Sequence, residues 1–389
     1  MERVIIVGGG LAGLRTAETL RAQGYAGGLT LVGAEPHAPY DRPPLSKAVL
    51  RGETDDTTVA ADFDALGCAT LLGRRATGLG EELETTEGPL AFDGLVIATG
   101  ATPIRLPGDG PQHVLRTIDD ARALRAALRP GARLVIVGAG WIGAEVATAA
   151  AAAGCRVTVA EAADAPLAGA VGAEAGTRTA RWYAEAGVEL RHGVKAASVE
   201  AGGLALAGGG SIEADLVLTG VGVRPETGWL EGSGLALENG VVVDEGLRTS
   251  RPGVFAVGDC AAWWSGRFGR RLRVEHWDVA LNAPDVVAAN LLGGERAYDA
   301  VPYFWSEQFG RMVQYAGHHP AADTTVWRED PEADRWSLCW LAGERLVAIL
   351  TVDRPRDLVQ GRRLIASGAA VDAGRLADPQ IPVKATVRG

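Results

Sequence analysis

Short apolar runs rich in branched residues alternate with longer mixed stretches along the chain. Residues 4–7 form such a run, and a stretch with helical spacing, residues 11–22, separates it from a second run at 29–32. The same order returns in the runs at 134–137 and 157–160, with an Ala-rich stretch between them. Short β-branched runs predict buried strands and longer periodic stretches predict helices. The pattern therefore predicts an α/β fold that contains one strand–helix–strand unit twice.

Three glycines in G-x-G-x-x-G register separate the first strand from the helix in each copy. They are Gly8, Gly10 and Gly13 in the first copy and Gly138, Gly140 and Gly143 in the second. The first glycine permits a tight turn, the second lets backbone approach a pyrophosphate, and the third lets the helix pack on the strand. Backbone N–H groups and the positive end of the helix then face the phosphates. Two such motifs predict two dinucleotide sites; the alternative is two ordinary glycine turns in an α/β protein.

An acid follows the second strand of each copy, where it can accept hydrogen bonds from a ribose. Glu161 comes directly after residues 157–160 and is followed by Ala162, Ala163 and Asp164, with no Arg close by. A 2′-phosphate would meet negative charge there, so the sequence favours NADH over NADPH. Glu35 is displaced from its strand by two residues, which leaves its role less defined.

Three further apolar runs, residues 95–98, 216–219 and 254–257, each lead into a glycine turn. The first turn holds Thr99 and Gly100, the second holds Gly220 and Gly222, and the third holds Gly258 and Asp259. Each could be a crossover beside a nucleotide, and the carboxylate of Asp259 could hold a ribitol hydroxyl. The alternative is a plain strand followed by a turn at each position.

Composition and charge narrow the class of protein. A chain of 389 residues that is 47% hydrophobic and 22% charged fits a globular enzyme of two or three domains. A net charge of −10 argues against general affinity for nucleic acid or anionic membranes. The four cysteines form no C-x-x-C pair, which favours a reducing compartment without disulfides or zinc. With no signal segment and no long apolar run, we expect a cytoplasmic protein.

Three motifs are more specific than the glycine turns: P-Y-D-R-P-P-L-S-K at 39–47, E-H-W at 275–277 and F-W-S-E-Q at 304–308. With them, nearly the whole chain resembles the ferredoxin reductase branch of the FAD-dependent pyridine nucleotide-disulfide oxidoreductase superfamily, which includes putidaredoxin reductase and reductases of ring-hydroxylating dioxygenases. The resemblance implies two Rossmann-like nucleotide-binding domains, as in glutathione reductase, and a smaller C-terminal α/β domain. The implied ranges are 1–107 and 228–300 for the FAD domain, 108–227 for the NAD domain and 301–389 for the C-terminal domain. In the last range, the runs at 312–316, 336–341 and 346–352 predict strands, and residues 355–366 predict a helix.

The resemblance also implies the site residues. For FAD they are Gly8, Gly10, Ala12, Gly13, Glu35, Arg42, Lys47, Thr99, Gly100, Arg116, Asp259, Glu275, His276 and Trp277. For NAD they are Gly138, Gly140, Ile142, Gly143, Glu161 and Gly222. Lys47, Glu145 and Trp305 are the implied catalytic residues: Glu145 pairs with Lys47 beside the flavin N5 and the nicotinamide, and Trp305 lies close to the isoalloxazine.

Elementary electrostatics supports the implied pair. A lysine near N5 would stabilise the negative charge of reduced flavin. A glutamate opposite it would neutralise the lysine while the flavin is oxidised, and would help to seat the nicotinamide. The alternative is that Lys47 and Glu145 are separate surface charges, because only the fold could unite two residues so far apart in sequence.

The missing cysteine pair indicates how electrons leave the protein. Disulfide reductases of this superfamily pass electrons through two closely spaced cysteines, which this sequence lacks. Reduced flavin must then serve an acceptor directly, and the family implies a small, acidic 2Fe-2S ferredoxin. Two basic clusters could steer it, or could simply be solvated faces. They are Arg267, Arg270, Arg271 and Arg273, and Arg354, Arg356, Arg362 and Arg363. Trp263, Trp264 and Trp305 could shorten the electron path, or could pack in the core.

The predicted function is thus an NADH-dependent ferredoxin reductase, monomeric or homodimeric, that feeds a haem monooxygenase or a Rieske dioxygenase. Two alternatives stay open. One is an NADH-dependent flavoprotein oxidase or quinone reductase. The other is a redox signalling flavoprotein like apoptosis-inducing factor, in which NADH binding changes shape and partners.

Overall fold

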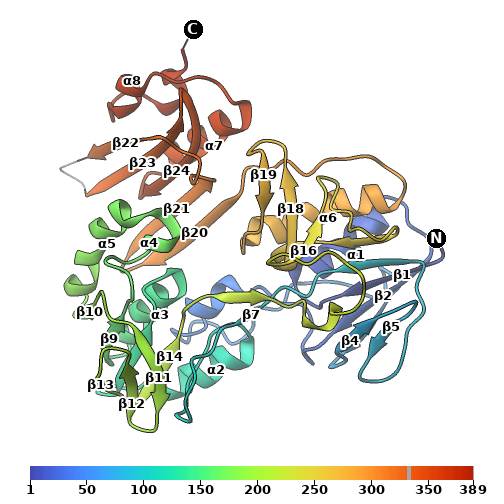
Figure 1. Cartoon of the computed structure of the whole chain (residues 1–389), viewed down its shortest axis with the longest axis horizontal. Coiled ribbons are helices and arrows are strands. Elements are labelled where there is room, and N and C mark those ends of the chain that lie inside the picture. Colours follow the sequence, from blue (N-terminus) through green and yellow to red (C-terminus); the bar gives the residue numbers. More distant parts are fainter. Residues whose placement is uncertain (331–333, 389) are drawn as a thin grey trace. The chain divides into compact units, whose positions relative to one another are not determined.

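The computed structural model describes residues 1–330 and 334–388, and its contacts divide the chain into two compact units (Figure 1). The first unit comprises Met1–Asp41, Thr57–Thr102 and Arg224–Pro302. The second comprises Arg42–Asp56, Pro103–Val223 and Tyr303–Gly389.

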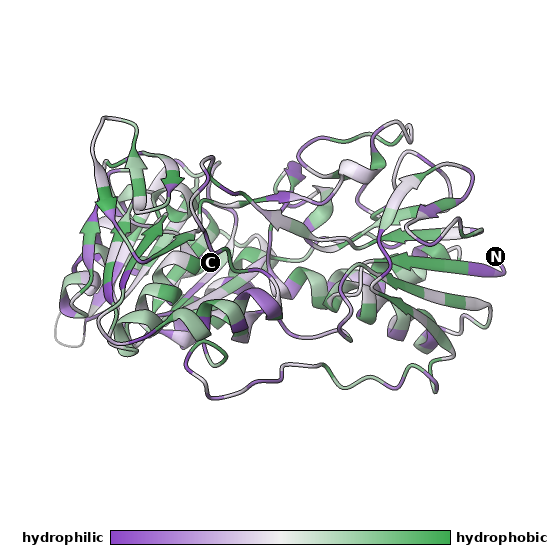
Figure 2. Ribbon diagram, turned by 90° about the horizontal axis from the view of Figure 1, so that it is seen from below, coloured by the Kyte–Doolittle hydropathy of each residue, from purple (hydrophilic) through white to green (hydrophobic). Residues whose placement is uncertain are grey.

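A five-stranded parallel sheet forms the centre of the first unit. Its strand order is β17-β6-β1-β2-β3, and its strands are β1 (Arg3–Val7), β2 (Gly28–Gly33), β3 (Cys68–Leu72), β6 (Gly94–Ile97) and β17 (Val254–Ala256). Strand β6 is buried throughout and β1 is buried after Arg3, which explains why both appear in the sequence as unbroken apolar runs. Figure 2 shows the hydrophobic colouring of the strands that lie near the N-terminus.

Helices α1 (Leu11–Ala22) and α6 (Trp277–Leu291) pack against each other within this unit. The remaining elements are β4 (Ala76–Leu79), β5 (Leu83–Thr85), η2 (Gly228–Leu230), β16 (Val241–Val243), η3 (Gly258–Cys260), β18 (Ala261–Ser265) and β19 (Arg270–Leu272). Two short strands, β7 (Ala101–Pro103) and β15 (Val223–Pro225), span the unit boundaries in the sequence.

The second unit contains its own parallel sheet, of strand order β10-β9-β8-β14. Its strands are β8 (Arg133–Val137), β9 (Arg156–Ala160), β10 (Glu189–Arg191) and β14 (Leu216–Thr219). Helix α3 (Trp141–Ala152) connects β8 to β9 and buries its small side chains against them. The other elements of this part are η1 (Pro43–Ser46), α2 (Ile118–Ala127), α4 (Ala168–Val171), α5 (Ala173–Glu185), β11 (Ala196–Glu200), β12 (Gly203–Leu206) and β13 (Ser211–Glu213).

An antiparallel sheet from the C-terminal part of the chain completes the second unit. Its order is β20-β21-β24-β23-β22, with β20 (Tyr303–Gln308), β21 (Arg311–Gly317), β22 (Thr324–Asp330), β23 (Arg335–Ala342) and β24 (Arg345–Val352). The elements α7 (Pro355–Ser367), α8 (Ala373–Ala377) and η4 (Val383–Thr386) follow. One hydrophobic core contains Trp182 of α5 together with Trp336 and Leu350 of this sheet, so the sheet is built into the unit.

The predicted α/β class with two nucleotide-binding-type sheets is confirmed. Three expected C-terminal strands and the helix at 355–366 are present, while β20 and β22 were not predicted as strands. Residues 42–56, which the sequence placed in the FAD domain, group by contact with the second unit. The four domain ranges stay a proposal.

Candidate functional site

The first glycine turn lies between β1 and α1. Gly8 has φ of +128°, and a Cβ there would lie 2.1 Å from the carbonyl oxygen of Ala98. A Cβ on Gly13 would lie 1.9 Å from the oxygen of Gly8. By contrast, a Cβ on Gly10 would meet nothing within 4 Å. Packing therefore requires the first and third glycines, whereas the second leaves an open backbone cradle of the kind that a diphosphate needs.

The second glycine turn, between β8 and α3, repeats this arrangement. Gly138 has φ of +100°, and its Cβ would lie 2.5 Å from the oxygen of Gly220. A Cβ on Gly143 would lie 2.0 Å from the oxygen of Gly138, while Gly140 again faces open space. Two separate segments have thus folded into the same cradle, and each fits a dinucleotide diphosphate.

Several predicted FAD residues lie at one edge of the first unit's sheet. In the register, Ala256 stands opposite Ile97, and Ile97 opposite Val7, so the three strands end together. Asp259 in η3 therefore comes close to the glycine turn, because a Cβ on Gly258 would lie 3.1 Å from the Cβ of Ala12. Thr99 and Gly100 follow β6 at this edge, and both are hydrogen-bonded to the backbone of Glu226. The Thr99 hydroxyl donates to the Glu226 carbonyl at 2.7 Å, and the Glu226 N–H donates to the Gly100 carbonyl at 2.9 Å.

The first acid, Glu35, has an internal partner. Its carboxylate accepts a 2.5 Å hydrogen bond from the hydroxyl of Tyr40, which is buried. Tyr40 belongs to the P-Y-D-R motif, so the motif orients the acid that was predicted to bind a ribose.

The second acid, Glu161, lies against its own glycine turn. Its carboxylate accepts the N–H of Ala139 at 2.6 Å and that of Ala163 at 2.8 Å. The carboxylate is thereby held beside the cradle, where a ribose hydroxyl would donate to it. Ile142 in the first turn of α3 is 40% exposed, and Gly222 after β14 has φ of +111°.

The remaining predicted FAD contacts belong to both units, and each group is described within its own unit. In the second unit, Arg42 donates to the carbonyl of Arg116 at 2.6 Å, so these two arginines are brought together. In the first unit, the indole N–H of Trp277 donates to Asp41 at 2.9 Å, which orients the ring at the start of α6. Glu275 pairs with Arg273 at 2.8 Å, and His276 is the N-cap residue of α6.

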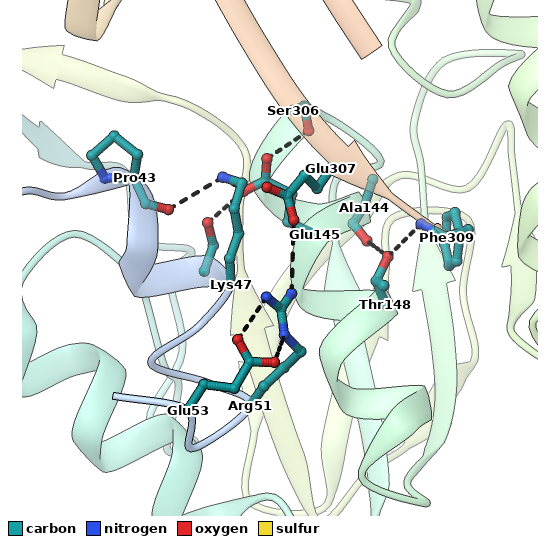
Figure 3. A network of polar contacts seen from close by, with 11 residues as sticks. Pro43, Lys47, Arg51, Glu53, Ala144, Glu145, Thr148, Ser306, Glu307 and Phe309 are labelled. Carbon is teal, nitrogen blue, oxygen red and sulfur yellow. Dashed lines mark hydrogen bonds and ion pairs between the residues drawn. The ribbon is translucent and has the colours of Figure 1, made fainter. Parts of the chain in front are cut away.

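A buried ion pair joins Lys47 to Glu145 (Figure 3). The two residues are 9% and 3% exposed, and the Lys47 Nζ lies 2.8 Å from Glu145 Oε2. Ser46 donates to the same oxygen, and Ser306 donates to Oε1 at 2.6 Å. Two buried charges persist only when well paired and further hydrogen-bonded, and these side chains meet that condition. The alternative of separate surface charges is wrong.

Local structure explains why these residues meet. Glu145 lies in α3, two positions after the last glycine of the cradle, and Lys47 follows directly after η1. Lys47 Nζ also donates to the carbonyl of Pro43 at 3.2 Å, so the lysine side chain is hydrogen-bonded to the first residue of η1. The arrangement holds a cation next to the helix that begins at the second glycine turn and can stabilise negative charge that develops beside it.

The third implied catalytic residue, Trp305, is partly buried on β20. Its ring stacks on that of Tyr303, with centroids 5.9 Å apart. Two more tryptophans were considered for the electron path. Trp263 is buried in the core of the first unit, whereas Trp264 is 42% exposed. Core packing is therefore the role of Trp263.

The two predicted basic clusters are partly neutralised by their neighbours. Arg267 pairs with Asp299 at 2.9 Å, and Arg271 donates to two backbone carbonyls. In the C-terminal part, Arg354 pairs with Asp357 at 2.8 Å. The exposed residues of the two clusters are Arg270, Arg356 and Arg363.

All four cysteines are free thiols. Burial raises the pKa of Cys260 and raises that of Cys339 to about 12. Cys260 lies within 3.5 Å of the carbonyl oxygens of Ile97 and Val257, as a packed side chain rather than a reactive one. Within residues 1–330 and 334–388, no cluster of three or more His, Cys, Asp or Glu could hold a metal. No helix in those ranges is both long and apolar enough to cross a membrane.

Comparison with known proteins identifies the family of this chain. Two glycine cradles in one chain are typical of oxidoreductases that use dinucleotides. Residues 2–283 match the model of the pyridine nucleotide-disulphide oxidoreductase family, and residues 303–387 match the reductase C-terminal family. The chain belongs to the pyridine nucleotide-disulphide oxidoreductase family, as the motifs predicted.

Individual relatives are similar over almost their whole length. The ferredoxin–NAD(+) reductase component of the anthranilate 1,2-dioxygenase system from Burkholderia cepacia is 39% identical, with 98% of each chain covered. The crystal structure of Fdr9 is 51% identical, with a TM-score of 0.95 over 98% of this chain and 99% of that one. The covalent putidaredoxin reductase–putidaredoxin complex gives 32% identity and a TM-score of 0.94, covering 98% and 97%.

Sequence reasoning missed the two serines that hold Glu145. Ser46 and Ser306 both stand inside quoted motifs, P-P-L-S-K and F-W-S-E-Q, so a signal was present. The motifs were interpreted through their charged and aromatic members, and a hydroxyl reveals its partner only once the fold brings the strands together.

Proposed function

We propose that the chain is an NADH-dependent ferredoxin reductase, which carries hydride from NADH to FAD and delivers single electrons to a 2Fe-2S ferredoxin. The observation that carries the proposal is the buried Lys47–Glu145 pair, whose glutamate lies on the helix that begins at the second glycine cradle. A buried charge pair beside a nucleotide-binding turn is more than packing requires, and such charged groups cluster at functional sites. Relatives named as ferredoxin reductases support the same reading.

The residues of the first unit fit FAD. Its diphosphate would lie on the open backbone of Gly10, its ribose would meet Glu35, and Asp259 would hold the ribitol. Thr99, Gly100, Ala12, Glu275, His276 and Trp277 are the further FAD contacts that the family implies. FAD, when bound, accepts hydride as a two-electron unit and can release electrons one at a time.

The residues of the second unit fit NADH. Its diphosphate would lie on Gly140, and its adenosine ribose would donate to Glu161. Because the Glu161 carboxylate beside the cradle would repel a 2′-phosphate, we propose NADH as the donor. Ile142 and Gly222 would line the nicotinamide half.

Lys47 is the proposed residue for charge stabilisation. Its ammonium would offset the negative charge that accompanies hydride transfer, in a site where burial strengthens the interaction. Glu145 would keep the lysine in place and balance its charge before transfer. Arg42 and Arg116, which are joined to each other, would contact FAD as the family implies.

The cysteines indicate how electrons would leave the reduced flavin. Three of the four thiols are buried, and no two stand at the spacing of a redox pair. Electrons therefore leave without a thiol relay, directly to an external one-electron acceptor. We propose that the exposed arginines of α7, Arg356 and Arg363, attract an acidic ferredoxin, and that the ferredoxin serves an oxygenase in the cytoplasm.

An anaerobic sequential assay tests this function. FAD-loaded protein is reduced with NADH, and a purified 2Fe-2S ferredoxin is then added while the iron–sulfur absorbance is followed. The proposal expects NADH to bleach the flavin and the ferredoxin to become reduced. Rapid turnover with quinone and none with several 2Fe-2S proteins would contradict it and favour a quinone reductase. A long-lived complex with NAD and a redox-dependent dimer, without turnover, would favour a signalling flavoprotein.

A further inference from the structure

The Glu145 carboxylate receives a hydrogen bond on each of its two oxygens. Oε2 accepts from Lys47 and Ser46, which are neighbours in one short segment. Oε1 accepts from Ser306 at 2.6 Å, and Ser306 lies on β20 in the C-terminal sheet. A carboxylate held through one oxygen can rotate about a soft terminal torsion, whereas a bond on each oxygen fixes its plane.

Ser306 is itself held in a defined orientation. Its side chain is fully buried, and the amide of Gln308 donates to its oxygen at 3.0 Å. Residues two apart on a strand point to the same face, which places Gln308 beside Ser306. Because the amide hydrogen occupies an acceptor position of the Ser306 oxygen, the hydroxyl hydrogen is directed to Glu145.

We infer that Ser306 is a positioning residue for the Lys47–Glu145 pair. Through Oε1 it sets the plane of the carboxylate, and so keeps Oε2 facing the lysine ammonium (Figure 3). The inference rests on the proposed function, since it assigns the C-terminal sheet a part in hydride transfer. Strand β20 would then fix the geometry of the Lys47–Glu145 pair, in addition to connecting the C-terminal sheet to α3.

A second contact separates positioning from attachment. Thr148 lies on α3 three residues after Glu145, and its hydroxyl accepts the N–H of Phe309 at 3.0 Å (Figure 3). This bond ties the same helix to the same end of β20, but it does not touch the carboxylate. Thr148→Val is therefore the matched control for Ser306→Ala, because both remove one bond between α3 and the C-terminal sheet.

The test compares these variants by stopped-flow reduction of FAD-loaded protein with NADH. Ser306→Ala should slow flavin reduction at saturating NADH by about ten-fold, since a hydrogen bond to a charged group is lost. Its NADH dissociation constant should change by less than about two-fold, as expected of a group that acts only during transfer. Gln308→Met, which leaves the hydroxyl but frees it to turn, should slow the step in the same direction. Thr148→Val should keep the wild-type rate.

A double-mutant cycle in denaturant supplies a readout independent of catalysis. Ser306→Ala and Glu145→Gln should be non-additive in the free energy of unfolding, whereas Thr148→Val and Glu145→Gln should be closer to additive. Equal slowing by Ser306→Ala and Thr148→Val, or wild-type rates in both Ser306→Ala and Gln308→Met, would overturn the inference. If wild-type protein is not reduced by NADH, the proposed function fails, while the unfolding cycle still decides whether Ser306 couples to the carboxylate.

Discussion

The two glycine modules have the same backbone and different side-chain chemistry. In both, the first glycine has positive φ and packs against a crossover strand, the third packs on the oxygen of the first, and the second faces open space. The difference lies two residues after the third glycine. There the first module has Arg15, which is 35% exposed and pairs with Glu18, whereas the second has the buried Glu145.

This difference separates the part of each module that is suited to bind a dinucleotide from the part that is proposed to assist hydride transfer. The backbone cradle is common to both modules and is suited to any dinucleotide diphosphate. The Arg15–Glu18 pair of the first module is partly exposed, whereas Glu145 on α3 is buried and contacts Lys47. Of the two modules, the second therefore carries the buried charge pair beside its helix. We therefore assign dinucleotide binding to the backbone that both modules share, and the proposed hydride transfer to the Lys47–Glu145 pair, which involves the second module.

The largest expected effect comes from breaking the charge pair. Lys47→Ala should slow flavin reduction by NADH on the order of 10²-fold, because a preorganised charge is removed. FAD retention should change far less, since the cradle is untouched. Stopped-flow reduction and FAD release measure the two. Arg15→Ala, at the position of the first module that corresponds to Glu145, removes a charge beside the other cradle; it is the control and should leave the rate unchanged. An unaltered rate in Lys47→Ala would remove this residue from the mechanism.

The glycines should divide into those needed for folding and one needed for binding. Gly143→Ala would place a Cβ 2.0 Å from a backbone oxygen and should destabilise the protein on the order of 3 kcal/mol. Gly140→Ala meets no neighbour, so its unfolding free energy should stay near wild type while NADH binding weakens. Chemical denaturation and NADH titration give the two quantities. Gly13→Ala and Gly10→Ala should repeat the division for FAD, and equal destabilisation by Gly140→Ala and Gly143→Ala would refute it.

The two acids should affect different nucleotides. Glu161→Arg should weaken NADH binding by about ten-fold or more, because a charged acceptor for ribose hydroxyls is replaced by a cation. It should also reduce the discrimination against NADPH. Glu35→Gln should leave NADH binding unchanged and weaken FAD retention instead. Unchanged NADH affinity in Glu161→Arg would show that the ribose is held elsewhere.

The smallest expected effect concerns the thiols. Burial raises the pKa of the thiols of Cys68, Cys260 and Cys339, so each stays protonated, and unreactive, at neutral and mildly alkaline pH. Iodoacetamide at about pH 8 should modify only the partly exposed Cys155 in native protein, and mass spectrometry locates the adduct. Ferredoxin reduction should continue after this treatment. Its loss would indicate that a thiol carries electrons after all.

Much of the fold followed from the sequence because its signals are local. The runs at 4–7 and 134–137 and the glycine registers required only hydrophobic periodicity and turn geometry to be recognised. Strand β20 was missed because Tyr303–Gln308 consists of three aromatic residues followed by three polar ones. It contains no β-branched residue, and its first half is only partly buried. Strand β22 was missed for a similar reason, since Thr324–Asp330 carries three charges, including Arg328, which is fully buried against Asp357.

The site was predictable where the motif itself defined the chemistry. The glycines and Glu161 stand at the offsets of the motif, so they could be named from spacing, whereas Glu35 is displaced by two residues and was named as the nearby acid. The pairing of Lys47 with Glu145 came from family resemblance, because no local rule joins residues so distant in sequence. Ser46 and Ser306 needed the fold: a hydroxyl has no preferred partner until strand and helix register place one within reach.

The most direct test of the central claim is the nucleotide content of the purified protein. If the paired cradles each hold a different dinucleotide, folded protein should retain or take up a single FAD per chain, and anaerobic NADH should then bleach that flavin at equimolar addition. A correctly folded protein that is colourless and binds no FAD when it is supplied would contradict the claim.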